Sequence, residues 1–116
     1  MAELSRIAPE LSVADLKLAL EWYEQKLGFH VAMEMSDAQY AIVERDAVAI
    51  HLFQSAAGQS VALHIFVTDL DGLQAELDQR GVSIAQRIVR KPWGNRDFRV
   101  YDPWGNELKF TEPLRS

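Results

Sequence analysis

An internal repeat constrains the fold of this 116-residue chain more than any other feature. Residues 13–16 read Val-Ala-Asp-Leu, and residues 67–70 read Val-Thr-Asp-Leu, 54 positions later. Each copy opens a helix-like stretch that ends in a glycine followed by an apolar residue, at Gly28 and at Gly81. Two landmarks with nearly the same spacing indicate that one structural unit was duplicated and fills almost the whole chain. The seam between two such units is a natural place for a ligand.

The first repeat, about residues 6–55, predicts one helix and four strands. Its first strand contains Pro9, which has no backbone N–H, so this strand is expected at a sheet edge or paired with another chain. Asp15 suits the N-cap of the helix, and Gly28 suits its C-terminal cap. The expected elements are a strand at 7–13, a helix from Asp15 to Gly28, a strand at 29–35, and a hairpin of 40–44 and 48–53.

The second repeat, about residues 60–112, follows a short linker at 56–60 and predicts the same order. Residues 102–106 (Asp-Pro-Trp-Gly-Asn) are a strong turn signal. The expected elements are a strand at 61–67, a helix from Asp69 to Gly81, and strands at 82–89, 98–101 and 107–111. The fold class is therefore α+β, with two βαβββ repeats forming a curved mixed sheet. A helix covers one face of each half, and the other faces can close into a cavity.

Composition places the chain among ordinary globular proteins, and a single domain of residues 1–116 is expected. No apolar run approaches the roughly 18 residues of a membrane span, so no membrane partner is expected. The lack of cysteine excludes disulfides and thiolate zinc sites, and a cytoplasmic location is expected. The net charge of −5 disfavours nucleic-acid binding and modestly favours a cationic ligand.

Several motifs resemble the vicinal oxygen chelate superfamily, which includes glyoxalase I, extradiol dioxygenases, fosfomycin-resistance enzymes and bleomycin-resistance proteins. The resemblance covers roughly residues 6–112, and Pro-Trp-Gly at 92–94 looks most like the bleomycin-resistance branch. It implies a homodimer in which N-terminal strands are exchanged, with two pockets formed by both subunits. The motifs that carry it are at residues 21–23 (Glu-Trp-Tyr), 27–29 (Leu-Gly-Phe), 92–94 and 102–106.

The same resemblance locates the metal ligands of the catalytic relatives, two in each half. Three of these positions hold Ala8, Ala62 and Lys109, and only His51 can coordinate a metal ion. The usual metal site is therefore absent, and neither a metal, a cofactor nor a catalytic residue is expected. His64 lies two residues beyond Ala62 on the same strand face, so a displaced metal site at His51 and His64 remains the alternative.

The candidate ligand-binding residues line the expected seam. Trp93, held between Pro92 and Gly94, is the sharpest of them, because a partly exposed indole stacks on flat ligand rings. In bleomycin-resistance proteins, the tryptophan of this motif clamps the flat tail of the antibiotic, whereas Met33 stands where that branch presents a second aromatic residue. The full set is Trp93, Tyr40, His51, His64, Phe53, Phe66 and Arg99.

Charged residues near this set leave two readings open. Arg96 and Arg99 either pair with Asp97 or Asp102 or meet an anionic group of a ligand. Acidic residues of the first hairpin region form either solvated turns or a rim that attracts a cation; they are Glu34, Asp37, Glu44 and Asp46.

The sequence predicts metal-independent, non-catalytic binding and sequestration of a small aromatic or cationic molecule, as in bleomycin-type resistance. The alternative is a divalent-metal-dependent lyase, isomerase or dioxygenase that uses the displaced His51/His64 site. A ligand-free structural dimer is the third possibility, and it predicts a pocket filled by the protein's own side chains.

Overall fold

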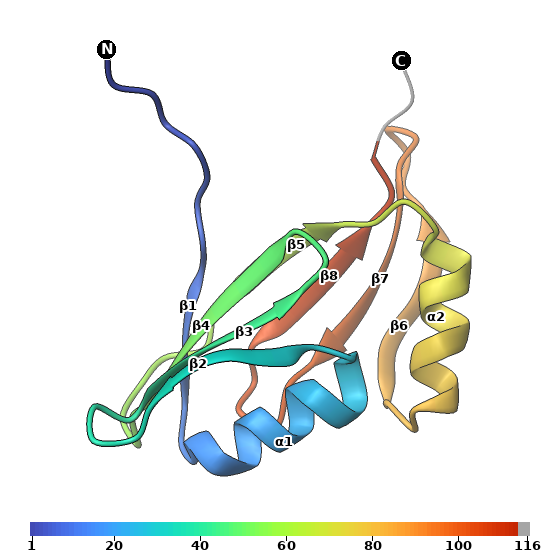
Figure 1. Ribbon diagram of the computed structural model, residues 1–116. Helices are drawn as coiled ribbons and strands as arrows, with labels where there is room; N and C mark the ends of the chain where they lie inside the picture. The colour runs from blue at the N-terminus through green and yellow to red at the C-terminus, as the bar shows by residue number, and fades with distance from the viewer. Residues whose placement is uncertain (114–116) are drawn as a thin grey trace.

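The computed structural model describes residues 1–113, which form two units with the same element order (Figure 1). The first unit comprises β1 (Glu10–Val13), α1 (Leu16–Leu27), β2 (His30–Met35), β3 (Tyr40–Arg45) and β4 (Val48–Gln54). The second comprises β5 (Ala62–Phe66), α2 (Leu70–Gln79), β6 (Ile84–Arg90), β7 (Arg96–Tyr101) and β8 (Glu107–Thr111). The predicted α+β fold of two βαβββ halves is therefore confirmed.

Each unit forms its own four-stranded mixed sheet, in the orders β1-β4-β3-β2 and β5-β8-β7-β6. In both, the first strand lies at an edge and runs parallel to the last strand of its unit. Strand residues on the helix side are buried, such as Val43 and Leu52 in the first sheet and Val100 and Leu108 in the second. The alternate residues point to the opposite side, which is called the open face of each sheet below.

Polar caps and glycines set the ends of both helices as the sequence predicts. Asp15 and Asp69 precede α1 and α2, and their carboxylates accept backbone N–H groups of the first turns at 3.0 and 3.1 Å. Gly28 and Gly81 follow the helices with φ angles of 72° and 77°, a conformation that glycine adopts without steric cost. Each chain reversal is therefore specified locally.

The N-terminal strand is shorter than the alternation predicts. β1 begins at Glu10, whereas residues 1–9 carry no regular structure and extend away from the rest of the chain (Figure 1). Leu4 and Ile7 are almost fully exposed, because no other part of the described chain lies beside them. The edge position expected from Pro9 is correct, and the Pro9 carbonyl still accepts a hydrogen bond from the His51 N–H at 3.0 Å.

A buried polar cluster joins the two units. The Asp102 carboxylate, only 4% exposed, accepts the Tyr23 hydroxyl of α1 at 2.9 Å and the Asn106 amide at 2.8 Å. The same amide donates to the Ser12 carbonyl of β1 at 3.1 Å, and Asn106 Oδ1 accepts the Val61 N–H at 3.0 Å. Burial, and next the charge of Asp102, raise the pKa of Tyr23 well above its usual value, so Tyr23 remains a neutral donor.

The C-terminal ends of the two helices contact each other reciprocally. Lys26 Nζ of α1 donates to the Arg80 carbonyl at 3.2 Å, and the Arg80 guanidinium donates to the Gln25 carbonyl at 3.1 Å. Each helix C-terminus thus receives a cation from the other half, which offsets the partial negative charge of its free carbonyls. Arg45 of β3 adds a two-pronged ion pair with Glu76 of α2, at 2.7 and 2.9 Å.

We expect Asn106→Ala to lower the free energy of unfolding by about 3 kcal/mol, because it removes three hydrogen bonds at a fully buried site. Urea unfolding followed by circular dichroism measures the change. Asn95→Ala is the matched control, since the buried Asn95 Oδ1 has no hydrogen-bond partner in the described chain. Equal losses in the two variants would show that the cluster does not stabilise the junction.

We expect Glu76→Gln to destabilise the protein at pH 7 by about 1 kcal/mol. Hydrogen bonds from Arg45, and then from Arg80, hold the pKa of Glu76 below its ordinary value of 4.5. A lowered folded-state pKa contributes stability above the unfolded-state value, and this stability is lost as the pH falls through the folded-state value. The difference between wild type and variant should therefore shrink below about pH 4.5.

Thermal unfolding between pH 7 and pH 3 checks this expectation. Glu24→Gln serves as the control, because Glu24 lies exposed on α1. A Glu76→Gln effect that stayed constant down to pH 3 would mean that the two arginines do not stabilise the Glu76 carboxylate.

Candidate functional site

The open face of the first sheet carries a chain of three polar side chains. The Tyr40 hydroxyl donates to Glu10 Oε2 at 3.0 Å and lies 2.6 Å from His51 Nδ1. Glu10 and His51 are register partners on β1 and β4, and Phe53 is the register partner of Tyr40. Partial burial, and then the hydrogen bond to Glu10, raise the pKa of Tyr40. The hydroxyl therefore stays protonated and links the carboxylate to the imidazole.

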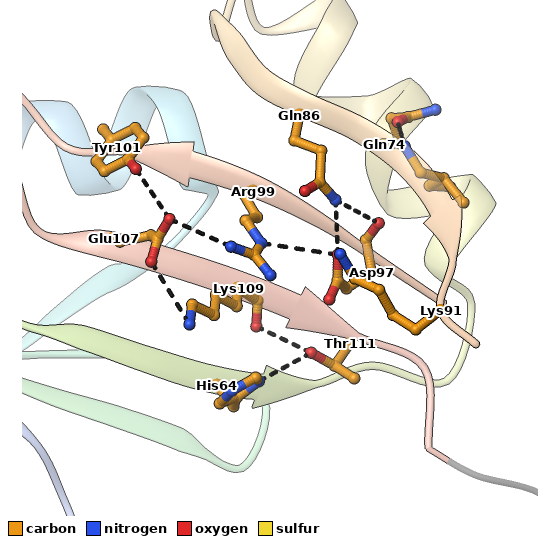
Figure 2. A network of polar contacts seen from close by, with 11 residues as sticks. His64, Gln74, Gln86, Lys91, Asp97, Arg99, Tyr101, Glu107, Lys109 and Thr111 are labelled. Carbon is orange, nitrogen blue, oxygen red and sulfur yellow. Dashed lines mark hydrogen bonds and ion pairs between the residues drawn. The ribbon is translucent and has the colours of Figure 1, made fainter. Parts of the chain in front are cut away.

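The open face of the second sheet combines aromatic and charged side chains. His64 and Phe66 of β5 stack with ring centroids 6.3 Å apart, and Phe66 is 66% exposed. His64 Nδ1 lies 3.2 Å from the Thr111 hydroxyl of β8. Arg99 of β7 and Lys109 of β8 are register partners on this face, and Figure 2 shows Lys109 between Arg99 and His64.

Two carboxylates hold these charged side chains together. Asp97, whose side chain is 3% exposed, accepts Gln86 Nε2 at 2.7 Å and lies 3.8 Å from Arg99 Nε. Glu107 accepts the Tyr101 hydroxyl at 2.9 Å and lies 3.8 Å from Arg99 Nη1. The hydrogen bond to Glu107, and then its charge, raise the pKa of Tyr101. The result is the polar network drawn in Figure 2.

Trp93 lies in the loop between β6 and β7 and is 67% exposed. Gly94 follows it with a φ angle of 106°, and the Gly94 carbonyl accepts the Arg90 guanidinium at 2.9 Å. The loop thus holds its backbone by local contacts while the indole stays accessible. This matches the prediction of an aromatic side chain held in a loop and partly exposed.

The structure divides the predicted site residues into two groups within one chain. Tyr40, His51 and Phe53 share the open face of the first sheet. His64, Phe66 and Arg99 share that of the second sheet, and Trp93 stands in a loop of the second unit. No strand pair joins the two sheets within residues 1–113, so the two groups lie on two separate sheets.

The sequence left the partners of Arg96 and Arg99 open between Asp97, Asp102 and an anionic ligand group. Arg99 Nε lies 3.8 Å from Asp97 Oδ1, which was one of these alternatives. Arg96 pairs neither with Asp97 nor with Asp102, but with Asp71 and Glu112 at 2.8 and 2.9 Å. The pairing of β7 with β6 brings Gln86 to Arg99, and the pairing of β7 with β8 brings Glu107 near it; both depend on a register that local alternation does not specify. Trp104, in the turn at 102–106, is half-buried against the core.

A comparison with family models identifies the fold. Residues 4–110 match the model described as the Glyoxalase/Bleomycin resistance protein/Dioxygenase superfamily. The chain belongs to this superfamily. No curated protein matches the chain significantly.

Solved structures of the superfamily resemble the chain along nearly its whole length. A bleomycin-binding protein from Streptomyces verticillus, complexed with copper(II)-bleomycin, is 26% identical, with a TM-score of 0.82 over 98% of this chain and 100% of that one. A bleomycin resistance determinant encoded on transposon Tn5 is 18% identical, with a TM-score of 0.86 over 97% and 100%. A lactoylglutathione lyase from Agrobacterium tumefaciens is 18% identical, with a TM-score of 0.77 over 96% of both chains. The likenesses at 18% identity show the fold alone.

The side chains at the positions where the resemblance places metal ligands do not fit a metal ion. Ala62 lies opposite Glu107 and brings only a methyl group, and Ala8 brings another. Lys109 brings an ammonium group that lies 3.6 Å from Glu107 Oε1. Within residues 1–113, no three His, Asp or Glu side chains converge as a metal centre would require. The donor set therefore differs from that of a metal-dependent relative.

A cavity of about 430 Å³ opens at the seam between the two units. It lies between the turn that joins β3 to β4 in the first unit and the segment from β5 to α2 in the second unit. Of the predicted site residues, Phe66 alone lines this cavity. Its floor is formed by buried core residues such as Leu77 and Phe110. None of the helices among the described residues is long and apolar enough to span a membrane.

We expect Glu10→Gln to lower the pKa of Tyr40 toward its ordinary value of 10.0, because the variant removes the charge and weakens the acceptor that favour the neutral phenol. Part of the elevation should remain, since burial is its largest cause. Titration of the tyrosine ¹³Cζ resonances by NMR measures the pKa of Tyr40 in the wild type and in the variant. Glu107→Gln is the matched control and should lower the pKa of Tyr101 alone. A Tyr40 titration that is identical in wild type and Glu10→Gln would show that the two groups do not interact in solution.

Proposed function

We propose that this protein binds and sequesters a small aromatic or cationic molecule without transforming it. The observation that carries the proposal is the set of accessible aromatic side chains on surfaces that no helix covers. Phe66 and Trp93 are about two-thirds exposed, and Tyr40 and Phe53 lie together on the other open face. Exposed aromatic groups of this kind mark binding surfaces. The fold neighbours support the proposal, because the bleomycin-binding protein from Streptomyces verticillus was solved with copper(II)-bleomycin.

Two copies of the chain build the binding cleft in this proposal. The open faces lie on separate sheets, and a cleft needs both as opposing walls. The N-terminal residues 1–9 extend away from the chain, and the exposed Leu4 and Ile7 need a partner to cover them. Exchange of these segments between subunits covers both side chains and continues β1, an edge strand, beyond Pro9. The functional unit is then a symmetric homodimer with two equivalent pockets.

Binding in this cleft uses contacts and no bond-breaking step. Trp93 stacks on a flat ring of the ligand, which contributes about 0.5–1.5 kcal/mol beyond the buried area. His51 and His64 supply hydrogen bonds, although Tyr40 already occupies one nitrogen of His51. Acidic side chains around the first hairpin attract a cationic ligand and raise its association rate; they are Glu34, Asp37, Glu44 and Asp46.

We expect bleomycin to bind with a stoichiometry of one per subunit, and Trp93→Ala to weaken this binding about tenfold through lost stacking and contact area. Isothermal titration calorimetry measures the affinity, and a DNA-cleavage assay measures sequestration. Leu18→Ala is the control, because Leu18 is an exposed apolar residue on α1, outside the predicted site. No heat and no protection of DNA would remove bleomycin as the ligand, and a Trp93→Ala variant that binds normally would exclude Trp93 from the site.

Metal analysis of untagged protein distinguishes this proposal from an enzymatic one. The proposal expects far less than one divalent ion per subunit and bleomycin binding that does not change after treatment with EDTA. One tightly held zinc, nickel, manganese or iron ion per subunit would overturn the proposal. It would favour the lyase, isomerase or dioxygenase alternative at His51 and His64.

A further inference from the structure

A row of hydrogen-bond donors crosses the open face of the second sheet. His64 on β5 is the register partner of Lys109 on β8, Lys109 is the partner of Arg99 on β7, and Arg99 is the partner of Gln86 on β6. Directly opposed side chains on neighbouring strands have Cβ atoms about 5 Å apart. Two cations thus stand side by side at the centre of the row, an arrangement that destabilises a sheet unless an anion lies nearby.

The two neighbouring carboxylates do not fully satisfy these cations. Their short hydrogen bonds come from neutral donors, namely Gln86 to Asp97 at 2.7 Å and Tyr101 to Glu107 at 2.9 Å. Arg99 remains 3.8 Å from both carboxylates, and Lys109 remains 3.6 Å from Glu107. A third cation, Lys91, lies 3.7 Å from Asp97, so three cations share two carboxylates. Figure 2 shows Lys91, Arg99 and Lys109 arranged around Asp97 and Glu107.

Other ion pairs of the chain show that closer approach is available to its arginines. Arg45 and Arg80 reach Glu76 at 2.7 and 2.8 Å, and Arg87 reaches Asp78 at 2.8 Å. A charge-assisted hydrogen bond between nitrogen and oxygen normally spans about 2.7–2.9 Å. In the described chain, by contrast, Arg99 Nε is buried and donates to no acceptor. Arg99 and Lys109 therefore stay at longer distances from the carboxylates than these other pairs do, so their charges are only partly matched within the described chain.

We propose that His64, Lys109 and Arg99 bind the carboxylate or phosphate group of an aromatic ligand. Lys109 and Arg99 supply the charge, and both remain partly exposed, at 22% and 29% of their side chains. Ala62 beside Glu107 leaves the approach to Lys109 unobstructed by a larger side chain. Phe66, stacked on His64, offers a ring platform next to the anion position.

This inference rests on the proposed binding function and narrows the ligand from an aromatic or cationic molecule to an aromatic molecule that carries an acidic group. A cationic group on this face would approach three cations with only two carboxylates between them. A ligand with a flat ring and one acidic group matches both features of this face. Its ring can stack on Phe66, and its acidic group can bind Lys109 and Arg99. The side chain at a metal position of the superfamily, Lys109, becomes the counter-charge for the ligand's acid.

Four naphthalene probes with different charges test the proposal on the full-length protein. They are 1-naphthoate, 1-naphthyl phosphate, the neutral 1-naphthalenemethanol and the cationic 1-naphthylmethylamine, with inorganic phosphate as a probe that lacks a ring. Calorimetry measures each affinity. The ¹⁵N–¹H resonance of Arg99 Nε reports directly on the row. We expect the affinity of each anionic probe to be at least about tenfold higher than that of the neutral probe, and we expect both anionic probes to shift this resonance.

Three variants separate charge from structure. Lys109→Met should lower the affinity for the two anionic probes about tenfold relative to the affinity of the same variant for 1-naphthalenemethanol, because only Arg99 then supplies charge, and Lys109→Arg should restore the preference. Arg87→Met is the matched control, because Arg87 lies on β6 and its guanidinium is already paired with Asp78. Thermal unfolding verifies that each variant is folded, and a lower affinity for anions at high salt is expected.

The possible results are distinguishable. Equal affinity for all four naphthalene probes, or tightest binding of the amine, would overturn the anion site and leave the proposed aromatic binding intact. Phosphate that shifts Arg99 while no naphthalene probe binds would support the anion site and overturn aromatic binding. Absence of all binding would overturn both. The ratio of the naphthoate and naphthyl phosphate affinities identifies which anion the row prefers.

Discussion

The buried carboxylate of Asp102 is the constraint on which the rest of the structure depends. A charged group that is 4% exposed requires several hydrogen bonds, and Asp102 receives four, from the Tyr23 hydroxyl, the Asn106 side chain and the backbone N–H groups of Trp104 and Asn106. Because Tyr23 belongs to the first unit and the other donors to the second, the carboxylate can be satisfied only when the units are correctly docked. The docking in turn fixes how the two sheets are oriented.

The sequence predicted the local elements well and the contacts between them poorly. Helix caps at Asp15 and Asp69 and the glycine at position 28 are short-range signals, and the structure bears them out. The turn at 102–106 was also predicted, but its carboxylate meets Tyr23 across 79 positions, which no local pattern can indicate. The ion pair between Arg96 and Asp71 was not found for the same reason, since Asp71 lies on α2 and not on a neighbouring strand.

Candidate site residues followed the same division. Alternation along each strand places His51 on the same face as Phe53, and His64 on the same face as Phe66, because side chains two apart share a face; Tyr40 joins the first group as the register partner of Phe53. The hydrogen-bond and ion-pair partners of each side chain could not be predicted, because they come from other strands. The donors on Arg99 remain unused because Gln86 and Tyr101 already bind the nearby carboxylates. One alternating pattern thus builds a core on one side of each sheet and a chemically varied surface on the other.

The reciprocal contact between the helix ends has a consequence for how the two halves can change. Lys26 and Arg80 stand 54 positions apart, and each donates to the end of the other's helix. Contacts exchanged between equivalent residues are the hallmark of an isologous interface, the kind found in symmetric dimers. A substitution at either position therefore acts on both helices at once. The linker at 56–60 holds the two units in one molecule, so this symmetric association is intramolecular. A substitution on one side of it therefore always affects the other side as well.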